Sequence, residues 1–315
     1  MRKLRLMPTD TQIQFMQGRF AGVITSAGLS TLSIGLFFYP GLNLGVDFRG
    51  GTVAELQVPR GTRADAIRNA LAQLGLGDIT VQQFGSPEDV LVGFGARPEA
   101  ANVEGAITAS LHEALPGAQL RRLDIVGAKV SGEMFRNGLL ATTLALLAVL
   151  AYIWFRFDWQ FGIGLVTTLV LDITKTVGFF AVTRFEFDLN AIAALLILIG
   201  YSVTDKVVVY DRIRENLKKH QTMPLRPLID LSINQTLGRT IATSTTVLLS
   251  IVPLAIIGGP ILRGFACAII FGIVIGTSSS IFIASPILLF LGEKRLRPRL
   301  ARISRRLPAP GQAPG

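Results

Sequence analysis

The sequence has little of the chemistry on which metal centres and most active sites depend. Its one cysteine, Cys267, sits in an apolar run, so no disulfide can form within the chain and no thiolate metal site is expected. The two histidines, His112 and His220, are far apart and have no metal-binding residues at ligand spacing. We therefore expect no metal ion, no haem, no iron–sulfur cluster and no other cofactor.

Charge is also scarce. Only 17% of the 315 residues are charged, against about 25% in ordinary globular domains. Half of the residues are hydrophobic and the mean hydropathy is +0.50, which is typical of a membrane protein. The net charge of +10 does not indicate nucleic-acid binding, because the basic residues gather at the ends of apolar runs rather than on a soluble domain.

Six apolar runs are each long enough to cross a bilayer as a helix, which takes about 20 residues. The first run follows a short basic segment, 1–20. It is too long for the core of a signal peptide and no A-x-A cleavage pattern follows it, so we interpret it as a retained span. The six predicted spans cover residues 21–39, 137–155, 160–182, 189–210, 231–258 and 264–291.

Basic residues indicate which side of the membrane the termini occupy. The short loops on one side of the membrane contain only two basic residues, Arg184 and Arg263, whereas the other side contains many. By the positive-inside rule, both termini are expected in the cytoplasm, with a basic, disordered tail at 292–315 that can touch membrane lipids. The cytoplasmic basic residues would be Arg2, Lys3, Arg5, Arg19, Arg212, Arg214, Lys218, Lys219, Arg226, Lys294, Arg295, Arg297, Arg299, Arg302, Arg305 and Arg306.

A polar insert at 45–136 separates the first two spans and is expected to form an external domain. It contains no glycine-rich phosphate loop, no nucleophile–base pair and no metal cluster, so we interpret it as a binding or docking domain rather than an enzyme. Apolar periodicity predicts the order β-α-β-β-α-β of a ferredoxin-like α+β unit. The predicted strands are 52–58, 79–84, 90–94 and 120–126, the helices are 63–74 and 99–115, and residues 85–89 form a turn-rich link.

The fourth span contains an acidic residue near its cytoplasmic end. Asp205 would lie roughly 6 Å inside the apolar layer, because four residues of helix separate it from the charged end. A carboxylate at that depth costs about 2.5–3.5 kcal/mol unless it faces protein or water, and intramembrane acids are usually functional. Its neighbour Lys206 points about 100° away, so it is expected to extend out to the interface rather than to pair with Asp205.

The fifth span offers a cation. Arg239 would lie roughly 12 Å along a helix that starts near Leu231, a depth at which it can approach Asp205 in an antiparallel neighbour. An acid opposite a guanidinium, with hydroxyls between them, is how a proton or cation path through a bundle would be built. The residues expected to support it are Thr204, Lys206, Asn234, Gln235, Thr240, Thr243, Ser244 and Thr246, although small polar residues also serve as ordinary helix-packing contacts.

Two more ionisable residues lie near the middle of the third span. Asp172 and Lys175 are three residues apart, so they share one helix face and can neutralise each other. We favour a structural ion pair for them, and a role in the same relay stays open.

Four motifs in this order resemble those of SecF subunits in the SecD–SecF protein-export family. GVDFRGG at 45–51 resembles the signature after the first span, and VGAKVSGE at 126–133 the segment before the second. GYSVTDKVVVYDRIREN at 200–216 resembles the fourth-span signature, and NQTLGRT at 234–240 the one that opens the fifth. The sequence departs from many relatives at Thr204, where they have Asn, at Leu171, where they have His, and at Ala128, where they have Pro.

The resemblance implies a six-span partner of SecD in the bacterial inner membrane, related to the resistance–nodulation–division transporters. It implies assistance to the SecYEG channel and SecA, with YajC as a further partner, in exporting unfolded polypeptides by the proton-motive force. In that family the residues at the positions of Asp205 and Arg239 are associated with proton conduction. No enzymatic activity and no nucleic-acid partner are implied.

Two other functions stay open at this point. One is half of a small-molecule or lipid exporter of the resistance–nodulation–division type, although such chains usually contain both six-span halves and two large external domains. The other is a scaffold whose charges only pair helices. An aspartate can serve either H⁺ or Na⁺, so the sequence leaves the coupling ion open as well.

Overall fold

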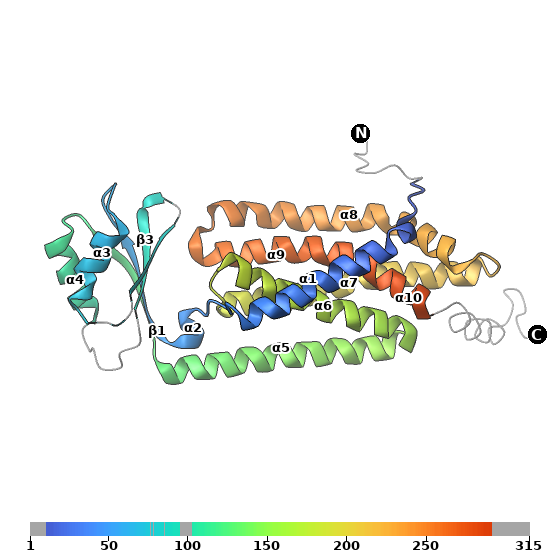
Figure 1. Ribbon diagram of the computed structural model, residues 1–315, viewed down its shortest axis with the longest axis horizontal. Coiled ribbons are helices and arrows are strands. Elements are labelled where there is room, and N and C mark those ends of the chain that lie inside the picture. Colours follow the sequence, from blue (N-terminus) through green and yellow to red (C-terminus); the bar gives the residue numbers. More distant parts are fainter. Residues whose placement is uncertain (1–10, 76, 78, 85, 95–102, 292–315) are drawn as a thin grey trace, which may run out of the picture.

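The computed structural model describes residues 11–291 apart from 76, 78, 85 and 95–102. The predicted basic tail at 292–315 and the first half of the N-terminal segment lie outside the described residues. Six long apolar helices form a bundle, and a small α/β domain is attached at one end of it (Figure 1). The prediction of six spans with an inserted α+β domain is confirmed.

The bundle contains helices of the length expected for membrane spans. The last span is not one regular helix, because α9 continues through a π-helical turn, η2, into α10. A short 3-10 turn, η1 (Phe15–Gln17), precedes the first span. The elements are α1 (Arg19–Phe38), α5 (Ala128–Arg156), α6 (Trp159–Thr183), α7 (Leu189–Lys219), α8 (Leu225–Ile257), α9 (Gly259–Ser279), η2 (Ser280–Ala284) and α10 (Ser285–Leu291).

The second span starts earlier than the sequence indicated. Helix α5 begins at Ala128, well before the predicted start at position 137, because the segment between them is polar yet continues the helix out toward the domain. There it meets α2 (Val46–Arg49), a one-turn helix that lies within the GVDFRGG motif at 45–51. The ring of Phe48 in α2 packs on Phe135 of α5 and on Phe187, with centroids 5.5 and 6.0 Å apart. These contacts join the domain's base to the bundle.

The α/β domain has the strand order β2-β3-β1-β4 with every neighbouring pair antiparallel, as in a ferredoxin-like unit. Alternate β1 residues Ala54 and Leu56 point to the helical face, where they form a core with Ile67 and Leu111. The expected link at 85–89 is wrong for most of its length, since β3 already begins at Ser86. The elements are β1 (Gly51–Gln57), α3 (Ala64–Ala72), β2 (Ile79–Phe84), β3 (Ser86–Phe94), α4 (Val103–Ala114) and β4 (Gln119–Val126).

Helices α1 and α6 approach each other closely. A Cβ on Gly178 of α6 would lie 2.2 Å from the Ser33 hydroxyl of α1, so only glycine fits there. Both helices end near the domain, where Asn43 donates a hydrogen bond from its amide to the Arg184 carbonyl at 3.0 Å. The two helices therefore run in the same direction.

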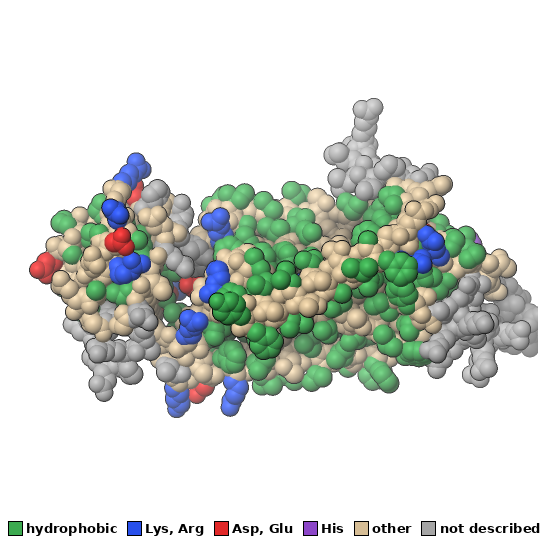
Figure 2. All heavy atoms as spheres, viewed as in Figure 1, with side chains coloured by type: hydrophobic (Ala, Val, Ile, Leu, Met, Phe, Trp, Pro, Cys, Tyr) green, Lys and Arg blue, Asp and Glu red, His purple; other side chains and the backbone are tan. Residues whose placement is uncertain are grey.

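The surface of the bundle is apolar between its two ends. Figure 2 shows charged side chains on the α/β domain and at the ends of the bundle, with hydrophobic side chains between them. Large apolar residues of α5 such as Leu144, Leu147 and Phe155 are exposed, as they are in a helix that faces lipid. The chain is a multi-pass membrane protein.

Candidate functional site

Helix α7 positions two neighbouring charged residues on different faces. The helix is capped by Asp188, whose side chain accepts a hydrogen bond from the Ala191 amide at 2.8 Å. Adjacent residues in a helix point about 100° apart. Asp205 faces α8, whereas Lys206 faces α6, and the two side chains belong to two separate polar clusters.

The Asp205 carboxylate is buried, with 6% of the residue exposed. Its Oδ1 accepts a hydrogen bond from the Thr240 hydroxyl of α8 at 2.8 Å. Its Oδ2 has no hydrogen-bond partner among the described residues, which is costly for a carboxylate oxygen away from water. The carboxylate lies in a pocket of about 190 Å³, here called the α7–α8 pocket, which is lined by Tyr201, Thr204, Asp205, Val208, Arg239, Thr240, Thr243 and Val247.

Arg239 lines the same pocket as Asp205. Within the described part of the chain, no ion pair joins the two side chains, and Arg239 is exposed. Thr204 and Thr243 are also exposed and line the pocket. The pocket therefore leads from a buried acid to the surface of the bundle. The expected ion path between Asp205 and Arg239 stays a prediction.

Tyr201 is a pocket residue that the sequence alone does not identify. Its hydroxyl lies 2.6 Å from the Ser244 hydroxyl and 3.2 Å from that of Thr277 on α9. Its position four residues before Asp205, and so on the same helix face, was the signal that could have identified it.

Asn234 and Gln235 do not line this pocket. The Asn234 amide donates to the Ile13 carbonyl at 2.8 Å and so attaches the N-terminal segment to α8. The Gln235 oxygen accepts from Arg212 at 2.7 Å and from Asn216 at 2.8 Å, which joins α8 to the end of α7. Both residues hold helix ends together, away from the buried acid.

Lys206 is buried, and the expectation that it extends to the interface is wrong. None of the residue is exposed, and its Nζ lies 2.8 Å from Asp172 Oδ2. Lys175 is 3.8 Å from Asp172 Oδ1, so the predicted pair of Asp172 with Lys175 is the looser of the two. A carboxylate on a facing helix holds Lys206 inside the bundle, and helix spacing within one span cannot reveal such a partner.

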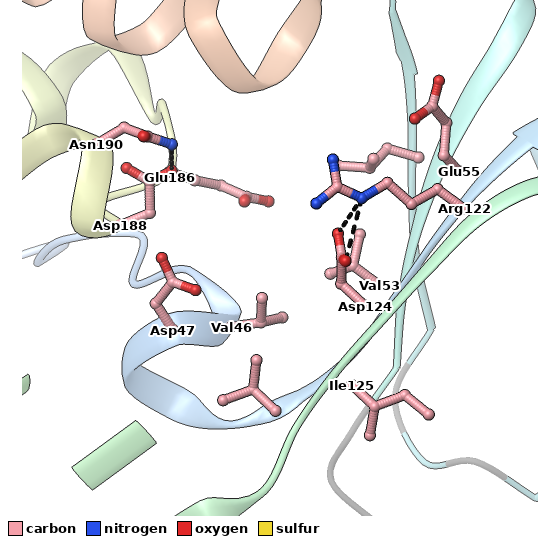
Figure 3. Close-up of a pocket in the computed structure, with 12 residues that line it drawn as sticks. Val46, Asp47, Val53, Glu55, Arg122, Asp124, Ile125, Glu186, Asp188 and Asn190 are labelled. Carbon is pink, nitrogen blue, oxygen red and sulfur yellow. Dashed lines mark hydrogen bonds and ion pairs between the residues drawn. The ribbon is translucent and has the colours of Figure 1, made fainter. Parts of the chain in front are cut away.

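A second cavity of about 440 Å³, here called the junction cleft, lies where the α/β domain meets the bundle (Figure 3). Acidic residues Asp47, Glu186 and Asp188 line its bundle side, and Arg122 faces Glu186 from the sheet. Arg122 pairs with Asp124 on its own strand at 2.9 Å. Burial and the nearby Asp188 and Asp47 raise the pKa of Glu186, and burial also raises the pKa of Asp188.

This raised pKa predicts a pH-dependent stability. The folded chain binds a proton at Glu186 more tightly than the unfolded chain, so stability falls as pH rises above the ordinary value of 4.5. We expect the melting temperature of Glu186→Gln to match that of the wild type near pH 4.5. At pH 8 the variant should melt about 1–2 °C higher than the wild type, because it lacks the buried charge that is repelled by Asp188 and Asp47. Melting temperatures of the purified wild type and variant, measured between pH 4.5 and pH 8, check this prediction. The control is Glu104→Gln, at an exposed position. An equal deficit or gain at both pH values would contradict the charge argument.

Comparisons with known proteins agree with these observations. The family model described as "Protein export membrane protein SecD/SecF, C-terminal" matches residues 106–294, and the model "SecD/SecF GG Motif" matches residues 35–58. Protein translocase subunit SecF of Cereibacter sphaeroides is 40% identical over 307 residues, covering 94% of this chain and 95% of that protein. Subunit SecF of Rickettsia akari is 40% identical over 93% of this chain and 96% of that one.

Longer proteins contain the same unit. Protein translocase subunit SecDF of Brucella abortus is 41% identical over 93% of this chain, which spans 39% of that protein. The crystal structure of SecDF from Thermus thermophilus matches with a TM-score of 0.83 at 33% identity, over 91% of this chain and 39% of that one. SecDF in a super-membrane-facing form matches with a TM-score of 0.69 at 32% identity. Since family models and full-length relatives agree, this chain belongs to the SecD/SecF protein-export family.

Proposed function

We propose that this chain is a SecF-type accessory subunit of the Sec translocase. Together with a SecD-type partner it would use the proton-motive force to promote export of unfolded polypeptides through SecYEG, after SecA has begun translocation. Its membership in the family and its match to two fifths of the fused SecDF proteins support this assignment, because the rest of those proteins supplies a SecD half. YajC would be a further partner.

The observation on which the coupling rests is the α7–α8 pocket. Asp205 is buried at membrane depth with one oxygen unpartnered among the described residues, and exposed polar groups lead from it to the surface of α7 and α8. Exposed polar side chains at this depth are costly against lipid, so this face favours a neighbouring protein. A carboxylate that gains and loses a proton there changes charge in a low-dielectric site, which can bias the packing of α7 against α8.

The positions of the basic residues support an orientation with both termini in the cytoplasm and the α/β domain on the opposite side of an inner membrane. The domain then stands where an exported polypeptide emerges. The junction cleft separates the domain from the bundle on one side, while α2 and α5 attach it. Movement of the domain against the bundle would transmit the energy of the gradient to the exported polypeptide.

Reconstitution tests the proposal. Vesicles containing SecYEG and a SecD-type partner would be prepared with and without this chain, and translocation of a secretory precursor would be followed after an imposed gradient. One charge moved through 100 mV yields about 2.3 kcal/mol, so acceleration of up to about 50-fold is expected only with the chain present and only without ionophore. A sodium gradient run in parallel distinguishes the ion. No response to either gradient would contradict the coupling.

A further inference from the structure

Three charged side chains are buried together between α6 and α7, on a different face of α7 from the one that carries Asp205. Asp172, Lys175 and Lys206 are 6%, 4% and 0% exposed. One carboxylate between two ammonium groups leaves a formal charge of +1 when all three are ionised. A net charge in the interior of a membrane bundle is costly, and loss of one proton makes the cluster neutral.

The donors around Asp172 are distributed unevenly. Its Oδ2 accepts three hydrogen bonds, from Lys206 Nζ at 2.8 Å, Ser202 Oγ at 2.8 Å and Ser279 Oγ at 2.7 Å. Its Oδ1 has no hydrogen-bond partner among the described residues, and Lys175 Nζ lies 3.8 Å from it. Lys206 is therefore fixed by its contacts, whereas Lys175 is the weakly held cation whose proton the cluster can release.

A row of serines on α1 approaches the cluster from outside. Ser26, Ser30 and Ser33 are buried on one face of α1, and Ser33 lies against Gly178 of α6. Since α1 and α6 run in the same direction, Ser30, three residues before Ser33, lies level with Lys175, three residues before Gly178. The hydroxyls of Ser26 and Ser30 have no hydrogen-bond partner within the described chain, so both are available to a proton or a water molecule.

The backbone next to the cluster is irregular. The π-helical turn η2 follows directly after Ser279, whose hydroxyl binds Asp172. Such turns are rare and are found mostly at functional sites. The Tyr210 hydroxyl of α7 donates to the Ala284 carbonyl of this turn at 2.8 Å, and Phe282 packs against Gly22 of α1. The turn thus connects α7, α9 and α1 around the buried charges.

From these observations we infer that Asp172, Lys175 and Lys206 form a second proton-exchange site, at which Lys175 releases its proton to the α1–α6 interface and regains it there. The cluster alternates between a charge of +1 and 0, and the proton passes to water or a hydroxyl along Ser30 and Ser26. The charged groups that act on Lys175 are Asp172 and Lys206. On α1 and α9 the charged residues, Arg19 and Arg263, lie near the helix starts.

This site is independent of the proposed function, so it is tested on the purified full chain in lipid nanodiscs without partner, gradient or substrate. Infrared difference spectra between pH 6 and pH 10 report the carboxylate stretch of Asp172, which shifts when the neighbouring ammonium loses its charge. The wild type is expected to give this band. Lys175→Met, always neutral, and Lys175→Arg, always charged, are expected to lose it, whereas the matched control Lys218→Met at the exposed end of α7 keeps it.

Persistence of the band in either Lys175 variant, or its absence in the wild type, would overturn the inference. If both Lys175 variants fail to fold, the inference is tested instead on the proposed proton path along Ser30. Ser30→Ala is expected to slow the appearance of the band after a pH jump at least threefold, while Thr31→Ala on the exposed face of α1 leaves the rate unchanged. Equal rates in these two variants would then overturn it.

Discussion

Replacing Asp205 by asparagine is expected to abolish the acceleration of export by an imposed gradient, while the chain still folds and binds its partner. Asparagine has the same shape, and its carbonyl oxygen can accept the Thr240 hydrogen bond that Asp205 Oδ1 accepts at 2.8 Å. It cannot exchange a proton, so the charge change on which the coupling depends is lost. The gradient-dependent rate should fall about 10- to 50-fold, to the rate without a gradient.

The matched control for this experiment lies on the same helix. Asp211 pairs with Arg156 at 2.7 Å, and both side chains are about two-fifths exposed, so Asp211→Asn removes an acid from α7 with little energetic effect. This variant should respond to the gradient as the wild type does. A normal response in Asp205→Asn would instead identify the α7–α8 pocket as a helix-packing feature and would favour a scaffold role.

The largest loss of stability is expected for Asp172→Asn. The substitution leaves Lys175 and Lys206 buried beside each other without a carboxylate, and removal of one partner from a buried ion pair typically costs about 3–5 kcal/mol. The free energy of unfolding, measured by titration of SDS into mixed micelles, and the amount of chain in the membrane should both fall. A stability equal to that of the wild type would contradict the ion pairing seen here.

A second substitution separates charge from packing. Adding Lys206→Met to Asp172→Asn returns the cluster to its original formal charge of +1 and should recover at least about half of the lost stability, because the two effects are not additive within one network. If the double variant is less stable than Asp172→Asn alone, the packing of the Lys206 side chain matters more than its charge.

The membrane-spanning segments could be predicted from the sequence because their length and apolar composition define them. Helices α1 and α6 lie almost where the apolar runs do. The start of α5 was misplaced since a helix continues into polar sequence wherever its backbone remains hydrogen-bonded, and composition reports only the part inside the apolar layer. The early start of β3 was missed because Ser86 and Pro87 favour turns but can also stand at the start of a strand, here directly after the tight pairing of Phe84 with Ser86.

The candidate site was readable only in part. Asp205 could be recognised because an acidic residue is unusual within an apolar run. The polar start of the fifth span indicated that residues around Arg239 would lie near it. Thr240, not Arg239, is the direct partner of the carboxylate. Which of two adjacent residues on α8 faces α7 depends on the rotation of each helix about its own axis, which packing decides.

The sequence by itself determined that this chain spans a membrane six times, that a β-α-β-β-α-β domain is inserted after the first span, and that its motifs belong to protein-export subunits. These properties depend on the length, periodicity and order of segments, all of which are local. Only the tertiary structure decided that Lys206 lies buried against Asp172 and that Asn234 binds the N-terminal segment. Partners such as these are distant in the chain, and they meet because the helices pack in one arrangement out of many that the same apolar runs would permit.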